Sequence, residues 1–273
     1  MQSIVAQVFR SYAHQRKTIN RALLGIDALV GDCLYSMLNE DERDRIVRIC
    51  YANTGHTVMK QAPELADWEM DWFKNTLPRP PARVLVGGAG WGREVMVLRS
   101  LGYNVVGFDP LFTPGDSGDV DGLMTGSYRD MSDAVIKGRP TCLSGIVDEP
   151  FDAIILGWTS LSHVTSAVRR LQIIEAADRL CPHGPILGSG WIYTEPQQPV
   201  RRSSKRLLIN NLAMRIGRLR GREEADNQFI FSPDFGFGVF IERGELEAAA
   251  SHTKRSLHLN QMPSAHFTLL PTT

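Results

Sequence analysis

Residues 84–92 read Val84-Leu85-Val86-Gly87-Gly88-Ala89-Gly90-Trp91-Gly92. The apolar run is typical of a buried strand, and the glycines after it predict a tight turn into a helix. Glycine tolerates positive φ and, having no Cβ, lets the backbone approach a ligand closely. Because the first N–H groups of a helix have no partner within that helix, this turn is a candidate ligand site.

The sequence pattern changes around this segment at Pro78, Pro80 and Pro81. Residues 1–77 read as helical, and we expect them to form an N-terminal cap. Residues 78–273 alternate short apolar runs with helical periodicity, which predicts an α/β core with a mostly parallel sheet and helices on both faces. Within it we expect strands at residues 83–86, 105–108, 152–156 and 186–189, and a basic helical insertion at about 197–225.

The glycine spacing separates two classes of adenosine ligand. A dinucleotide loop has the pattern G-x-G-x-x-G, whereas here Arg93 follows Gly92 and the pattern is G-x-G-x-G. Asp109 ends the second predicted strand, where a carboxylate can accept hydrogen bonds from both hydroxyls of a ribose. The acid fits either class of ligand, and its alternative is a strand-end residue that caps the turn at Pro110.

Further segments extend the pattern along the chain, at Phe151–Gly157, Leu161–Val164 and Glu175–Gly184. From residue 82 onward, the chain resembles the class I (Rossmann-like) S-adenosylmethionine-dependent methyltransferase family. The resemblance implies a Rossmann-like sheet with strand six at Gly238–Ile241 and an antiparallel last strand at His266–Leu270.

The resemblance also implies S-adenosyl-L-methionine as the cofactor. The methionyl side would meet the glycine loop, Asp109 would take the ribose, Pro110 and Leu111 would flank the adenine, and Asp130 would meet its amine. Gly157 is a further residue implied to bind the cofactor. The implied loop residues are Gly88, Ala89, Gly90 and Gly92. The sequence departs from the family at Val86, where the family usually has an acid. Arg93 and Glu94 are candidates to take over the role of that acid. Alternatively, they are a solvated pair in the first turn of the helix.

Methyl transfer is an in-line displacement, and it needs a general base only when the acceptor is protonated. His163 follows the fourth predicted strand and is the candidate catalytic base, with a structural role as its alternative. Trp158, Trp191 and Tyr193 are expected to wall off the substrate or to pack in the core. Residues Tyr51–His56 would form part of a lid or a turn that ends a helix.

The amino-acid composition limits the kinds of partner, metal site and cellular location that we expect. Lys+Arg and Asp+Glu are balanced at 30 each, so we expect neither DNA nor a membrane as a partner. The four cysteines form no C-x-x-C pair, which indicates no metal site and a reducing, cytoplasmic location. Gln7, Arg10 and His14 interrupt the apolar residues at the start, so we expect no signal peptide.

The favoured function is transfer of a methyl group to a small molecule. The basic segment Arg201–Arg222 suggests an anionic acceptor, although it also reads as a solvated helix. Two alternatives remain: an NAD(P)-dependent oxidoreductase, and a non-catalytic methyltransferase-fold protein that binds a partner or RNA through residues 201–222.

Overall fold

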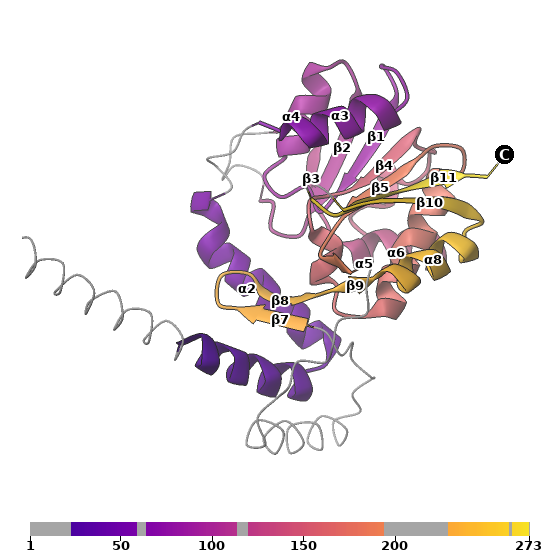
Figure 1. Ribbon diagram of the computed structural model, residues 1–273. Helices are drawn as coiled ribbons and strands as arrows, with labels where there is room; N and C mark the ends of the chain where they lie inside the picture. Colours follow the sequence, from indigo (N-terminus) through magenta and orange to yellow (C-terminus); the bar gives the residue numbers. More distant parts are fainter. Residues whose placement is uncertain (1–22, 59–63, 114–119, 194–228, 262–263, 273) are drawn as a thin grey trace, which may run out of the picture.

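The computed structural model describes residues 23–58, 64–113, 120–193, 229–261 and 264–272 (Figure 1). The predicted basic insertion and residues 201–222 lie outside the described residues. Among the described helices, none is long and apolar enough to cross a membrane.

The centre of the structure is a seven-stranded sheet with the order β10-β11-β5-β4-β1-β2-β3. β1 to β5 run parallel, while β11 is antiparallel to both β5 and β10. The strands are β1 (Arg83–Gly87), β2 (Asn104–Asp109), β3 (Leu123–Thr125), β4 (Ala153–Leu156), β5 (Ile186–Ser189), β10 (Arg255–Asn260) and β11 (His266–Pro271). The predicted sheet, mostly parallel with an antiparallel last strand, is confirmed.

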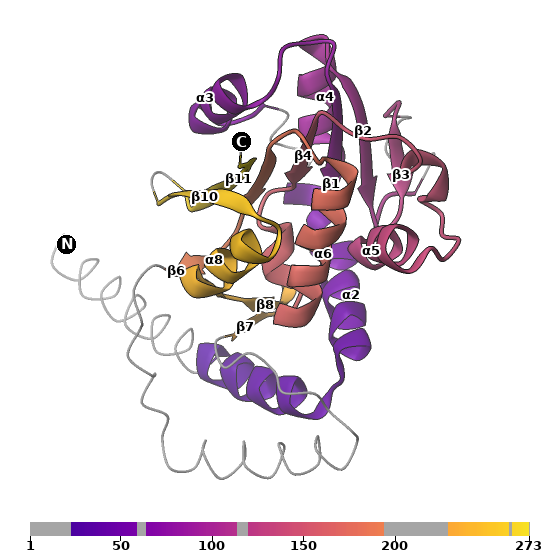
Figure 2. The same ribbon diagram turned by 90° about the vertical axis from the view of Figure 1, so that its right-hand side faces the viewer.

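Both faces of the sheet are covered, which explains the continuous apolar run in β1. Val84 and Val86 face one cluster, which includes residues of α3 (Asp67–Thr76) and α4 (Arg93–Ser100). Leu85 faces the other cluster. That cluster receives α5 (Tyr128–Lys137), α6 (Ala167–Leu180) and α8 (Arg243–His252), and Figure 2 shows α6 and α8 across this face.

A second layer lies beyond the carboxyl ends of the parallel strands. Residues 23–37 are helical, and α2 (Glu40–Val58) follows them. The hairpin of β7 (Phe229–Ser232) and β8 (Gly236–Val239) packs on these helices through Tyr35, Phe237 and Val239. β6 (Ile192–Tyr193) pairs with β9 (Ile241–Glu242) in a separate two-stranded sheet, and two 3-10 helices, η2 (Ser144–Ile146) and η3 (Ser160–His163), complete the fold.

The position predicted for strand six is wrong. Residues 238–241 lie in β8 and β9, outside the main sheet, and β10 follows α8 to take the sheet edge. Gly238 lies against Trp191, where a Cβ would come within 2.0 Å of the indole ring. A short apolar run predicts a strand without saying which sheet it joins. β10 alternates exposed residues with buried or partly buried ones, as an edge strand does, so its apolar signal is weaker.

The boundary between cap and core stays a prediction. Helical residues do occupy the described parts of 23–77, as expected from the sequence. However, Phe73 and Leu77 pack in the same cluster as Val84 of β1, so α3 is part of the covering of the sheet.

Candidate functional site

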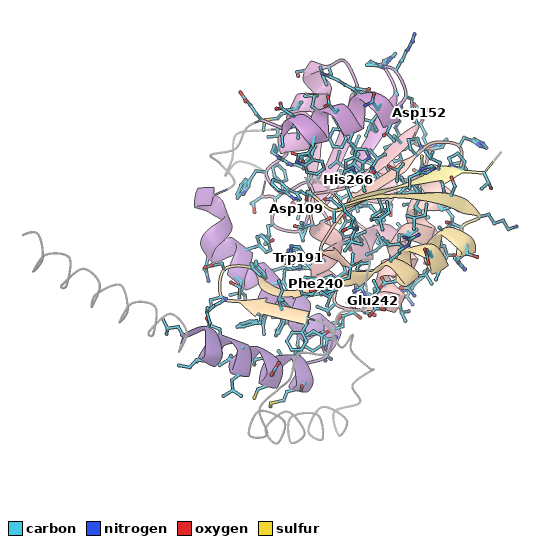
Figure 3. The ribbon with its side chains drawn as sticks, viewed as in Figure 1. Asp109, Asp152, Trp191, Phe240, Glu242 and His266 are labelled. Carbon is cyan, nitrogen blue, oxygen red and sulfur yellow. The ribbon has the colours of Figure 1, made fainter. Side chains whose placement is uncertain are left out.

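A cavity of about 450 Å³ lies between the carboxyl ends of the parallel strands and α2. Figure 3 shows Asp109 at this end of the sheet, whereas Asp152 lies at the opposite end, beside the start of β4. One end of the cavity is formed by the glycine loop and the residues after β2, and the other by charged side chains of α2, α5 and α6.

The glycine loop needs its glycines for two different reasons. Gly88, Gly90 and Gly92 all have positive φ, at 63°, 55° and 83°. A Cβ on Gly88 would come within 2.6 Å of Ser160, and one on Gly92 within 3.0 Å of Val120. A Cβ on Gly90 would meet nothing within 4 Å. Gly90 also lines the cavity, so it presents bare backbone to whatever occupies that space.

Asp109 closes the same end of the cavity. Its Oδ2 accepts a hydrogen bond from the N–H of Gly90 at 2.9 Å, and its Oδ1 accepts one from the N–H of Leu111 at 2.8 Å. Burial raises the pKa of this carboxyl. Each carboxylate oxygen has two acceptor sites, so both oxygens can accept a further hydrogen bond from a ligand.

Tyr128 and Ser160 form a hydrogen-bonded pair beside the glycine loop. Tyr128 Oη donates to the carbonyl of Gly87 at 2.8 Å and lies 2.6 Å from Ser160 Oγ. Burial raises the pKa of Tyr128, so its phenol stays protonated. The sequence did not predict this pair, because its members come from α5 and η3 and only the fold brings them together.

His163 lies in the wall of the cavity, at the end of η3. Its Nε2 is 2.8 Å from Tyr51 Oη, and its Nδ1 is 3.0 Å from the carbonyl oxygen of Phe237. Trp191 and Phe235 pack edge-on against the ring, with centroids 5.4 and 5.9 Å away. Burial lowers the pKa of His163, so the ring is neutral near pH 7.

Charged residues line the far end of the cavity. Lys137 pairs with Asp133 at 2.6 Å, and Arg169 pairs with Glu40 at 2.8 Å. Asp44 also lines the cavity, and burial raises its pKa.

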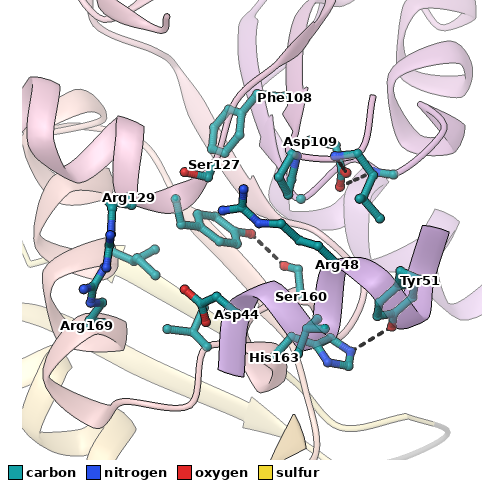
Figure 4. Close-up of a pocket in the computed structure, with 18 of the residues that line it drawn as sticks. Asp44, Arg48, Tyr51, Phe108, Asp109, Ser127, Arg129, Ser160, His163 and Arg169 are labelled. Carbon is teal, nitrogen blue, oxygen red and sulfur yellow. Dashed lines mark hydrogen bonds between the residues drawn. The ribbon is translucent and has the colours of Figure 1, made fainter. Parts of the chain in front are cut away.

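Arg48 extends from α2 into the cavity (Figure 4). Burial raises the pKa of Asp44 and of Asp109, and the positive charge of Arg48 acts in the opposite direction on both pKa values.

Seven of the residues predicted for the site line the cavity: Gly88, Gly90, Asp109, Pro110, Leu111, Trp158 and His163. The roles assigned to them stay predictions.

The other predicted residues do not line the cavity. Ala89 is buried in the core beneath the loop, and Gly92 precedes α4 as its N-cap. Gly157 packs so closely on the loop that a Cβ would lie 2.6 Å from the carbonyl oxygen of Gly88. Trp191 packs on His163, while Tyr193 stacks on Phe240 with a centroid distance of 4.4 Å.

Asp130 lies outside the cavity wall as well, and its carboxylate has a structural task. Oδ2 accepts hydrogen bonds from Ser127 N at 2.9 Å and Ser127 Oγ at 2.5 Å, which makes a capping box at the start of α5. The neighbouring Ser127, Tyr128 and Arg129 line the cavity instead.

Arg93 and Glu94 hold α3 against α4. Arg93 forms ion pairs with Glu69 at 2.7 Å and Glu94 at 2.9 Å, and both carboxylates are buried. Its guanidinium also lies 4.7 Å from the centroid of Trp158. The family usually has an acid at the position of Val86, which is fully buried here. Neither Arg93 nor Glu94 lines the cavity, so neither replaces that acid through direct contact with a ligand in the cavity.

One face of α2 forms a further part of the cavity wall. The sequence predicted a helical cap and a candidate lid at residues 51–56, but it did not predict Asp44, Val47 or Arg48 as lining residues. Asp44, Val47, Arg48, Tyr51 and Ala52 all line the cavity, and their spacing puts them on one side of a helix. The helix continues to Val58, so the predicted turn within residues 51–56 is absent.

Comparisons with known proteins address the fold alone. No protein-family model and no curated protein matches the sequence. An amino pentose methyltransferase from Micromonospora echinaspora, CalS10, solved with bound SAM, is 14% identical, with a TM-score of 0.49 over 76% of this chain and 91% of that chain. The 1,6-didemethyltoxoflavin-N1-methyltransferase of Burkholderia thailandensis is also 14% identical, with a TM-score of 0.49 over 85% of this chain and 89% of that chain.

A putative zinc-dependent alcohol dehydrogenase from Rhodobacter sphaeroides is similar too, at 11% identity and a TM-score of 0.46 over 84% of this chain and 98% of that chain. Similarities of this size do not establish a shared activity. The fold follows instead from the sheet itself, with its antiparallel β11 between β5 and β10, a glycine loop after β1 and an acid at the end of β2. The chain has a Rossmann-like fold of the class I methyltransferase type.

Proposed function

We propose that this protein is an S-adenosylmethionine-dependent methyltransferase that acts on a small molecule. The observation that carries the proposal is the pairing of Asp109 with the open backbone at Gly90, side by side at one end of a cavity of about 450 Å³. Ligand pockets commonly measure roughly 300–1,000 Å³, so the cavity has room for a ligand of this class.

The residues present fit the cofactor. Asp109 would accept the two ribose hydroxyls, and Pro110 and Leu111 would flank the adenine. Gly88 and Gly90 would let the methionyl part lie against the backbone. When bound, the cofactor supplies a methyl group activated by a positively charged sulfur. The chain has to orient the acceptor in line with that methyl group and to keep water away from it.

Electrostatics at the start of α4 favour this cofactor over a dinucleotide. A pyrophosphate binds at a helix N-terminus because the N–H groups and the helix dipole favour negative charge there. Here Glu69 and Glu94 are both buried beside Arg93, the first residue of α4, and share its single guanidinium. The three groups carry a net negative charge, which opposes a pyrophosphate and tolerates a sulfonium.

The acceptor would occupy the space between the glycine loop and the charged side chains of α2, α5 and α6. That end of the cavity contains Asp44, Arg48, Arg129, Asp133, Lys137 and Arg169. Because charges of both signs are present, the lining suits a polar acceptor, and an anionic group on it would find cations within the same cavity.

Replacing Asp109 by Ala tests the proposal. A hydrogen bond to a charged group contributes about 1.5–3 kcal/mol, and a loss of 1.4 kcal/mol lowers the affinity about tenfold. Loss of both ribose contacts should therefore weaken the binding of S-adenosylhomocysteine by about 100-fold or more. Calorimetric titration measures the affinity, and circular dichroism checks the fold.

Asp133→Ala is the matched control, since Asp133 lines the far end of the cavity and pairs with Lys137. We expect it to bind S-adenosylhomocysteine as the wild type does. A folded Asp109→Ala variant with unchanged affinity would show that the ribose does not bind at Asp109.

A further inference from the structure

We propose that Tyr51 and His163 act as a proton-accepting pair in this cavity, with Tyr51 contacting the methyl acceptor, and that the acceptor therefore carries an O–H or N–H group. The inference rests on the proposed function. To the proposed function it adds Tyr51 of α2 as a catalytic residue, and it limits the acceptor to molecules with an O–H or N–H group.

Hydrogen bonds fix the tautomer of His163. The carbonyl of Phe237 can only accept, so Nδ1, at 3.0 Å from it, carries the hydrogen. A neutral ring then has its lone pair on Nε2, and the Tyr51 O–H donates to it at 2.8 Å. The lone pair of the imidazole is thus directed at a phenol in the wall of the cavity (Figure 4).

The surroundings keep this pair in the required protonation state. Burial lowers the pKa of His163, which leaves the imidazole neutral and able to accept a proton. Burial, aided by the nearby charge of Asp109, raises the pKa of Tyr51 to about 12, so the phenol keeps its proton until the histidine takes it. Trp191, Phe235 and the carbonyl of Phe237 also contact the imidazole, and these groups do not titrate near pH 7.

Tyr51 is placed to meet the acceptor. It lines the cavity on the same face of α2 as Asp44 and Arg48, whereas Phe237 behind His163 does not line it. A phenol oxygen that donates its hydrogen to Nε2 still has lone pairs, so it can accept a hydrogen bond from a ligand O–H or N–H. His163 then serves as the base through Tyr51.

The lone pair of the acceptor atom forms a bond to the methyl carbon, and the electron pair of the broken carbon–sulfur bond stays on sulfur. The proton of the acceptor passes to Tyr51 Oη while the proton of Tyr51 passes to His163 Nε2. One positive charge leaves sulfur and one appears on the imidazole, where the Phe237 carbonyl stabilises the Nδ1–H.

This chemistry selects the acceptor. A hydroxyl, a phenol or a protonated amine must lose a proton to react, and a base accelerates such a transfer by roughly 10²–10⁴-fold. A carboxylate is already deprotonated near pH 7 and gains nothing from the pair. We therefore expect the natural acceptor to be an alcohol, a phenol or an amine.

The test combines a screen with two matched variants. Wild-type protein is incubated with methyl-labelled S-adenosylmethionine and a panel of alcohols, phenols, primary amines and carboxylic acids. We expect label transfer to members with an O–H or N–H group, and kcat lower by roughly 100-fold in Tyr51→Phe and His163→Gln. Tyr103→Phe is the control, because Tyr103 packs on the far side of the sheet beside α4 and lies outside the cavity wall.

The pH profile separates a proton-accepting role from a structural one. In the wild type, the rate should fall as the pH is lowered through the pKa of His163, which lies below the ordinary value of about 6.5. His163→Gln should lose this limb. Nitrogen-15 spectra of labelled histidine should show neutral His163 with its hydrogen on Nδ1 at pH 7, and this readout needs no acceptor.

Three results would overturn the assignment. The first is a protonated or Nε2–H form of His163 at pH 7, and the second is a Tyr51→Phe variant with the kcat of the wild type. The third is methyl transfer to carboxylic acids alone, or to no member of the panel with an O–H or N–H group. Binding of S-adenosylhomocysteine, measured on the same samples, distinguishes this failure from that of the proposed function. If it binds and any of these results holds, only the Tyr51–His163 pair is wrong.

Discussion

Gly90 and Gly138 adopt nearly the same left-handed backbone, with φ of 55° and 61°, and a Cβ on either would meet nothing within 4 Å. Gly138 ends α5 and does not line the cavity, whereas Gly90 lines it. Replacing either by Ala should therefore cost a similar free energy of unfolding, about 1–2 kcal/mol, because the left-handed conformation disfavours a Cβ.

The two variants should differ in ligand binding. The Gly90→Ala methyl group would enter the space where the proposed cofactor meets the backbone, so we expect S-adenosylhomocysteine affinity to fall by at least about tenfold, a loss of about 1.4 kcal/mol. Gly138→Ala should bind as the wild type does. Chemical denaturation and calorimetry measure the two quantities, and equal affinities in both variants would mean that the ligand does not lie against Gly90.

Individual residues also show how far the site could be predicted from the sequence. Asp109 was predictable because the end of a parallel strand is defined by the apolar run before it. Asp130 was not, because a carboxylate three residues after Ser127 fits a capping box as well as a ligand contact, and the structure has the capping box. Trp191 and Tyr193 follow β5 as expected, yet both pack on other aromatic rings.

At the level of elements, α6 and α8 are joined by an ion pair between a buried arginine and a partly buried glutamate. Arg170 is almost fully buried and binds both carboxylate oxygens of Glu245, at 2.6 and 2.7 Å. Breaking such a pair by removing one partner is strongly destabilising. We expect Glu245→Ala to lower the free energy of unfolding by about 3–5 kcal/mol.

Glu247→Ala is the matched control on the same helix. Its partner Arg243 is four residues away, and both side chains are more than half exposed. Exposed pairs of this kind contribute about 0.3–0.5 kcal/mol. Urea denaturation of both variants tests the comparison, and equal losses would show that the Arg170–Glu245 pair does not hold α8 on the sheet.

Elements differed in how well the sequence predicted them. The interior strands β1, β2, β4 and β5 were predicted within one residue or so, because burial on both faces requires a continuous apolar run. β10 was missed, since an edge strand needs only alternate apolar residues and includes Arg255 and His258. A helical cap over the site and a candidate lid at residues 51–56 were expected, but Asp44 and Arg48 were not predicted to line the cavity, because they look like the solvated face of a helix.

At the scale of the whole molecule, the cavity is assembled from distant parts of the chain. Tyr51 and His163 are separated by 112 residues, and His163 and Phe237 by 74. The first comes from α2, the second from η3 and the third from β8. Only the packing of α2 and the β7–β8 hairpin beyond the carboxyl ends of the strands brings them together, so no local pattern could have predicted the pair.

The proposed preference for S-adenosylmethionine over NAD depends on the glycine spacing and on the charge at the start of α4, and calorimetric titration of the wild-type protein compares the two ligands directly. We expect S-adenosylhomocysteine to bind at one site per chain and NAD to give no binding heat. Binding of NAD without binding of S-adenosylhomocysteine would contradict it.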